Sequence, residues 1–110
     1  MSRKIATIIT AITGDRIVVG EEELKHAMEE HFPMLPKDIL LELIERILKD
    51  PTKIFEQEKL SQYHLFYRLD NRSYLVVIVK KTLTGNYFSS MYSTGSSIRN
   101  RHKHLKEIKP

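Results

Sequence analysis

Cysteine and tryptophan are absent from this 110-residue sequence, and glycine and proline occur only four times each. Without cysteine there are no disulfides and no thiolate metal sites, which agrees with a reducing compartment. The few glycines occupy turn-like positions and form no phosphate loop, and neither a nucleophile elbow nor paired catalytic carboxylates occur. No apolar run approaches the roughly 18 residues of a membrane span, and the N-terminal segment lacks a signal peptide's apolar core. We expect a cytoplasmic protein without membrane partner, cofactor or bound metal.

The charges are unevenly distributed along the chain. Residues 1–60 hold nine Lys/Arg against twelve Asp/Glu, whereas residues 61–110 hold nine against two. A basic half of this kind attracts polyanions, and RNA or DNA is the commonest such partner. The alternative is a protein partner, either the acidic half of a neighbouring subunit or an acidic inhibitor.

A single α+β domain with a mainly antiparallel sheet is the expected fold, since 110 residues support one modest core. β-branched and aromatic runs predict the strands. These are Ile5–Thr10, Arg16–Val19, Tyr63–Leu69, Tyr74–Val79 and Tyr87–Tyr92. The last two form a central hairpin around a turn at Thr84-Gly85-Asn86, and Lys53–Glu58 is either a short strand or an irregular edge.

Three helices are expected. Two N-terminal helices, from about Glu21 to Phe32 and from about Pro36 to Lys49, carry apolar stripes at helical spacing and pack on one side of the sheet. Pro33 ends the first, and Asp50-Pro51 ends the second. The segment Ile98–Ile108 predicts a short basic C-terminal helix.

Several short motifs resemble one nuclease family. They are RIVVGEEELKHAMEEHFP, an apolar helix closing in DPTKIF, and the strands YHLFYRL, SYLVVIVKK and YFSSMYS. Together they are similar to the phage-type branch of the barnase, EndoU, colicin and RelE-like (BECR) nucleases. The branch shows H-x-x-x-x-H-P, which stands here from His26 to His31 with Phe32 interposed before Pro33. Ser90-Met91-Tyr92 replaces a threonine, a small residue and a tyrosine.

This resemblance implies a metal-independent endoribonuclease, deployed as a toxin or phage effector, with RNA as substrate and a cognate antitoxin or immunity protein as partner. Cleavage by 2′-hydroxyl transesterification needs a base, an acid and cations around the phosphate. His31 is the leading acid/base candidate, because its helical position follows the stripe of Leu24 and Ala27 towards the sheet. His26 lies on the opposite side among glutamates, and it is the alternative functional histidine.

The remaining candidates are cations and hydroxyls. Arg68 and Lys80 are expected to stabilise charge on the phosphate, and Ser90 and Tyr92, which share strand parity, to position it. Lys81 alternates with Lys80, so only one of the two faces the site, and parity leaves the choice open. The further residues expected to bind the nucleic-acid backbone are Lys81, Arg99, Arg101 and Lys103.

Two other functions compete with nuclease activity. A non-catalytic nucleic-acid-binding module would use the same basic half without cutting its ligand. An interaction protein would place that half against an acidic chain. Strand-end lysines also serve simply to prevent sheets from pairing edge to edge, which is the structural alternative for Lys80 and Lys81.

Overall fold

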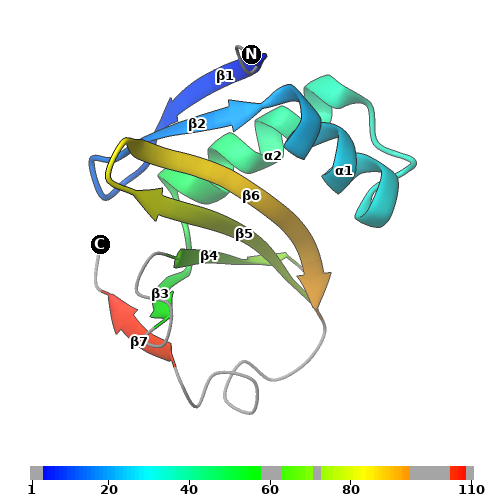
Figure 1. Ribbon diagram of the computed structural model, residues 1–110. Helices are drawn as coiled ribbons and strands as arrows, with labels where there is room; N and C mark the ends of the chain where they lie inside the picture. The colour runs from blue at the N-terminus through cyan, green and yellow to red at the C-terminus, as the bar shows by residue number, and fades with distance from the viewer. Residues whose placement is uncertain (1–3, 58–62, 71–72, 95–104, 109–110) are drawn as a thin grey trace.

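The computed structural model describes residues 4–57, 63–70, 73–94 and 105–108 (Figure 1). Seven strands and two helices follow one another in the described part of the chain. They are β1 (Ile5–Thr10), β2 (Arg16–Gly20), α1 (Glu21–His31), α2 (Lys37–Lys49), β3 (Lys53–Gln57), β4 (Tyr63–Asp70), β5 (Ser73–Thr82), β6 (Gly85–Thr94) and β7 (Leu105–Ile108). The predicted α+β class is confirmed.

The strands form one mixed sheet in the order β1-β2-β6-β5-β4-β3-β7. Every pairing is antiparallel except that of β2 with β6, so the predicted, mainly antiparallel sheet is also confirmed. The parallel contact is short, joining Ile17 to Asn86 and Val18 to Tyr87. Beyond it, α1 lies beside the second half of β6 (Figure 1). Along β6, the neighbouring element is therefore β2 at first and α1 beyond the end of β2.

The β5–β6 hairpin is the centre of the sheet, as predicted. Its register runs from Tyr74 opposite Thr94 to Thr82 opposite Gly85, with an irregularity between Ile78 and Val79. The loop consists of residues 83–84, so it begins one residue and ends two residues before the predicted turn, and the Thr82 hydroxyl bonds across it. Thr82 Oγ1 accepts hydrogen bonds from the Thr84 and Gly85 amides at 3.2 and 3.1 Å and donates to the Gly85 carbonyl. Gly85 has φ 155°, which side-chain-bearing residues rarely adopt.

The two helices follow the predicted limits closely. Three glutamates occupy the first turn of α1, where the helix dipole favours negative charge, and the helix ends just before Phe32. Pro36 is the N-cap of α2. The helices were predicted as N-terminal, but they stand in the middle of the element order. The β1–β2 hairpin precedes them, and the β3 to β7 strands follow.

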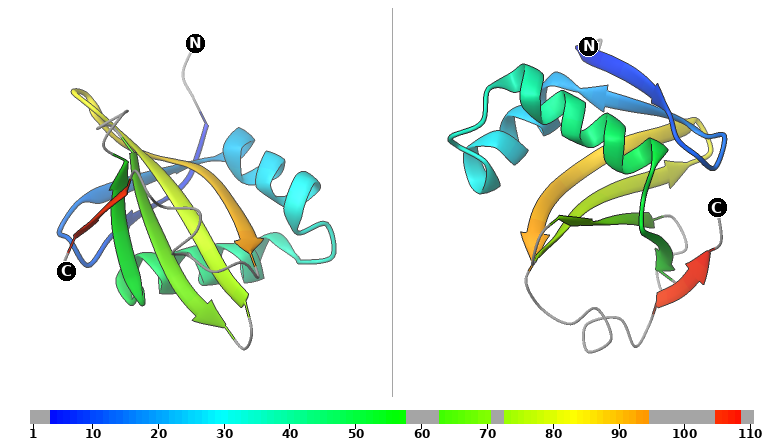
Figure 2. Two further views of the ribbon diagram at one scale, coloured as in Figure 1. Left: turned by 90° about the horizontal axis from the view of Figure 1, so that it is seen from below. Right: turned by 180° about the vertical axis from the view of Figure 1, so that it is seen from behind.

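One face of the sheet packs against the helices. Residues alternate sides along a strand, and Leu75, Val77 and Val79 of β5 join the buried apolar stripes of both helices in one core. In Figure 1 α2 passes behind β5 and β6, so this helix side faces away from the viewer. Figure 2 shows the same arrangement from below and from behind.

The opposite face, which we call the front face, has its own smaller apolar cluster. It comprises Phe55, Tyr74, Val76, Ile78 and Tyr92, from three strands. Phe55 and Val76 are buried, although α1 and α2 belong to the core on the other side. The curled sheet therefore has apolar packing on both sides.

The C-terminal segment differs from the prediction. Leu105–Ile108 was expected to be the last turn of a helix, but it is strand β7, paired antiparallel with β3. Pairing Ile54 with Ile108 packs Ile108 against the main core, which offsets the helical preference of so short a segment. The doubtful segment at residues 53–58 is also a strand over its described part, and β7 makes it an interior one. The rest of the predicted helix, residues 98–104, lies outside the described residues.

Within the described ranges, neither helix is long and apolar enough to cross a membrane.

The core placement of α2 predicts a sharp contrast between two isoleucines on that helix. Ile44 is fully buried, whereas Ile39 is 42% exposed. Ile44→Ala should lower the free energy of unfolding by about 2–5 kcal/mol, because it leaves a cavity in the core. Urea denaturation measures the change. Ile39→Ala is the matched control and should cost less than about 1 kcal/mol; similar losses in the two variants would contradict the described packing.

Candidate functional site

His31 is the last residue of α1, and its position follows from the helix's buried stripe. Leu24 and Ala27 of that stripe are buried against the sheet. One further turn brings His31 to the same side of the helix, where its side chain remains 38% exposed. The imidazole lies next to Tyr92 of β6, with ring centroids 6.3 Å apart at an angle of 51°, and next to Phe32 at 6.4 Å. The Glu30 carboxylate approaches its Nε2 at 3.8 Å.

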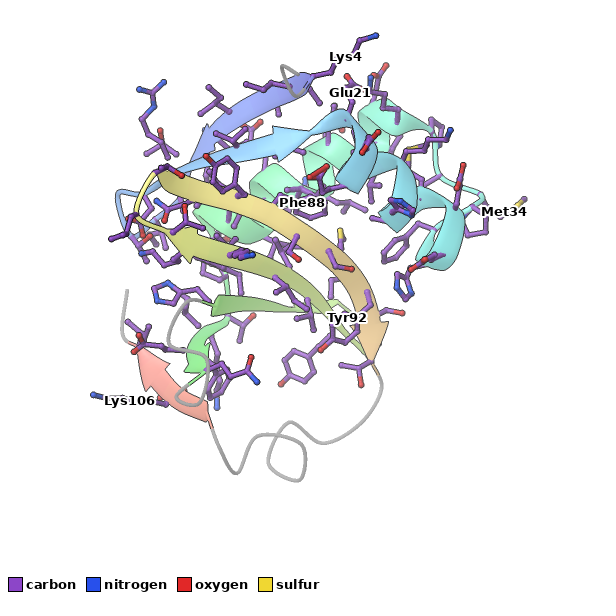
Figure 3. All side chains as sticks on the ribbon, viewed as in Figure 1. Lys4, Glu21, Met34, Phe88, Tyr92 and Lys106 are labelled. Atoms are coloured by element: carbon purple, nitrogen blue, oxygen red, sulfur yellow. The ribbon has the colours of Figure 1, made fainter. Side chains whose placement is uncertain are left out.

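Tyr92 comes from the front face. Its strand partner is Val76, and Ser90 pairs with Ile78, so Ser90 and Tyr92 share a face as their parity predicts. Figure 3 labels Tyr92 near the end of β6, next to the end of α1. Both side chains are partly exposed. An imidazole and two hydroxyl groups thus gather at this end of the sheet, which we call the His31–Tyr92 site.

Lys80 shares the front face but lies towards the other end of it. It pairs with Tyr87, five residues from Tyr92 along β6. On β5 the same separation is the four residues from Lys80 to Val76, so four to five steps of ~3.3 Å give about 15 Å along the sheet. Lys80 therefore does not belong to the His31–Tyr92 site, although the sequence predicted all three residues in one catalytic centre.

Arg68 is nearer to that site by backbone position. It pairs with Leu75, which pairs in turn with Ser93, the neighbour of Tyr92. Two strand spacings of ~4.8 Å place its backbone about 10 Å from Ser93. Leu75 belongs to the helix side, so the register position of Arg68 is on the face opposite Tyr92. Arg99, Arg101 and Lys103 lie outside the described residues.

Lys81 faces the helix side, which resolves the choice between the two lysines. It follows Val77 and Val79, whereas Lys80 follows Val76 and Ile78 towards Ser90. Its ammonium donates to Asp15 Oδ2 at 3.0 Å, and the two side chains are 28% and 29% exposed. Lys81 thereby holds the β1–β2 turn against β5.

His64 of β4 is a titratable group that the sequence reasoning missed. It pairs with Val79, and the charges of Lys81, Glu56 and Asp15 all act on it. Burial, followed by the Lys81 cation, lowers the pKa of His64, although Glu56 and Asp15 act in the opposite direction. The alternation of YHLFYRL was a signal that His64 has a buried face, but its charged neighbours come from distant segments.

Asp15 completes this group. Burial alone would raise the pKa of its carboxyl, but the hydrogen bonds from Lys81 and Thr13 outweigh burial and hold the pKa below its usual value. The Thr13 hydroxyl donates to the same Oδ2 atom at 2.8 Å. The Asp15 carboxylate thus accepts hydrogen bonds from both Lys81 and Thr13. We therefore interpret Asp15 and Lys81 as a structural ion pair.

No group of three or more metal-ligating side chains converges within residues 4–57, 63–70, 73–94 and 105–108. His26, the alternative histidine, is exposed on the outer side of α1.

Comparison with known proteins found no matching family model, no matching curated protein and no matching solved structure.

The lowered pKa of His64 predicts a pH-dependent stability. Unfolded His64 titrates near its ordinary value of about 6.5, so the unfolded chain binds a proton more readily than the folded chain. The free energy of unfolding should therefore fall as the pH drops below about 6.5. Urea denaturation at about pH 7.5 and about pH 5.5 measures this fall, and His64→Gln should reduce it.

His26→Gln is the matched control, because it removes an exposed histidine and should leave the fall unchanged. An equal fall in wild type and in His64→Gln would show that His64 is not the responsible group.

Proposed function

We propose that this protein is a metal-independent endoribonuclease whose chemistry takes place at the His31–Tyr92 site. The observation that carries the proposal is the 6.3 Å approach of the two rings, contributed by a helix and by a strand that are far apart in the chain. A partly exposed imidazole beside a phenol offers two groups able to exchange protons with a ligand. Ser90 adds a hydroxyl on the same strand face.

The two rings suit the proton transfers of RNA transesterification. In the proposed reaction the His31 imidazole takes the proton of the 2′-hydroxyl, and the 2′-oxygen attacks the phosphorus. The bond from phosphorus to the 5′-oxygen then breaks, and that oxygen receives a proton from the Tyr92 hydroxyl. The products are a 2′,3′-cyclic phosphate and a free 5′-hydroxyl. Ser90 hydrogen-bonds a non-bridging phosphate oxygen.

Negative charge that develops on the phosphate requires a cation. Among the predicted cations, Arg68 has its backbone at the His31–Tyr92 end of the sheet, but its register position is on the helix side with Leu75, so we assign this role to the basic C-terminal segment instead. The basic segment of the sequence that contains Arg99, Arg101 and Lys103 follows β6 and supplies contacts to the RNA backbone. Lys80 is removed from the catalytic group by its register. An antitoxin or immunity protein, as the family resemblance implies, would inhibit the enzyme by covering the front face.

One observation favours a second candidate, a nucleic-acid-binding module without catalysis. Lys80 lies on the same face as Tyr92 but about 15 Å away along β6, so positive charge extends along the face rather than converging on the imidazole. Such spreading suits a bound strand as well as a cleaved one. The two candidates differ only in whether the RNA is cut.

The nuclease proposal predicts RNA cleavage that survives EDTA and depends on His31. Incubation of end-labelled RNA with the protein should release fragments that end in 2′,3′-cyclic phosphate. His31→Ala should reduce the rate by about two orders of magnitude or more, the effect expected for the loss of a proton-transfer group. Tyr92→Phe, which keeps the ring and removes the hydroxyl, should reduce it by at least about tenfold.

His26→Ala is the matched control on the same helix and should cleave at the wild-type rate. Cleavage that stops on chelation, or that His31→Ala leaves unchanged, would refute the assignment. Salt-dependent RNA binding without any product would favour the binding module instead.

A further inference from the structure

A groove opens on the front side of the sheet, away from the His31–Tyr92 site. It has a volume of about 630 Å³ and lies over β1, β2, β6 and β5. Its walls combine apolar and polar side chains. They include Ile5, Val18, Glu23, Lys80, Tyr87 and Ser89. Neither His31 nor Tyr92 contributes to it, so the groove is a separate place on the molecule.

The walls of the groove suit a flat, partly apolar ligand. Val18 lies opposite Tyr87, so an aliphatic side chain and an aromatic ring stand side by side on neighbouring strands. The Tyr87 hydroxyl lies 3.5 Å from Thr84 Oγ1, so the ring reaches the hairpin loop. An aromatic ring in a groove is a surface on which nucleic-acid bases stack, and this contact tolerates any base.

The groove has a positively charged residue on one side and a negatively charged residue on the other. Lys80 stands on β5, and it has no acidic partner among the described side chains. Glu23 stands on α1, on the other side of β6, and would repel a phosphate there. An anionic group in the groove must therefore lie on the side of Lys80 and Ser89. Ser89 is exposed beside the irregularity in the β6 register.

We propose that this groove binds a nucleoside of single-stranded RNA, with its base on Tyr87 and its phosphate on Lys80. The inference rests on the proposed function, because it makes the groove a second subsite for the strand that is cut at His31 and Tyr92. About 15 Å along β6 separates the two places, which is too far for one nucleotide to occupy both. The groove holds a nucleotide that is not adjacent to the cleaved bond, and Lys80 is a binding residue.

This subsite predicts that affinity depends on chain length. The probes are a fluorescent 2′-O-methyl dinucleotide and hexanucleotide, which lack the attacking hydroxyl. Fluorescence anisotropy measures their binding to the 110-residue chain. The hexanucleotide should bind about tenfold more tightly than the dinucleotide, since one stacked base contributes about that factor. Lys80→Ala and Tyr87→Leu should each abolish most of this gain.

Lys49→Ala is the matched control, because it removes an exposed lysine of α2 that is paired with Glu45. It should keep the full gain. A gain that survives both Lys80→Ala and Tyr87→Leu would overturn the inference, as would the absence of any gain in the wild type. Circular dichroism of each variant checks that the fold is retained, and Ser89→Trp, which fills the groove from an exposed position, provides an independent block.

The result also separates this inference from the proposed function. RNA cleavage that depends on His31 without a length-dependent gain would retain the nuclease and reject the subsite. A length-dependent gain that requires Lys80 and Tyr87, in a protein that cuts no RNA, would retain the groove as an RNA site and reject the nuclease.

Discussion

The short parallel contact between β2 and β6 is the constraint on which the rest of the arrangement depends. It joins only Ile17 and Val18 to β6, after which the chain turns into α1 at Gly20. Because the strand neighbour ends there, a helix takes its place beside the second half of β6. The buried stripe of Leu24 and Ala27 fixes the rotation of that helix. His31 consequently arrives next to Tyr92, and a longer β2 would have kept them apart.

Local sequence patterns predicted most of the helices and strands and part of the candidate site. Runs of β-branched and aromatic residues predicted the strands, and the spacing of the apolar residues predicted both α1 and α2 and the side of α1 on which His31 lies. The hydroxyls of Ser90 and Tyr92 were correctly assigned to one face, because side chains alternate along a strand and the irregularity in β6 lies outside residues 90–92. Local chemistry also predicted the hairpin, and the observed loop begins one residue before the predicted turn.

Long-range pairing was the part that sequence reasoning missed. Leu105–Ile108 has a helical pattern, but the edge of β3 provides backbone partners and a place for Ile108 in the core. The ion pair between Lys81 and Asp15 joins residues that are 66 positions apart, so the local sequence around either residue could not predict it. The distance of Lys80 from Tyr92 likewise depends on the register of β5 against β6, which composition does not determine.

The proposed account therefore divides the front face into two places along β6, one for proton transfer and one for holding the strand. Its central claim is that His31 and Tyr92 lie on either side of the same bound phosphodiester group. The most direct test is an NMR titration of the His31 and Tyr92 ring signals with a nucleoside 3′-monophosphate, which resembles a cleavage product. The account predicts that both rings shift together with one dissociation constant. Shifts in neither ring, or in only one of them, would contradict it.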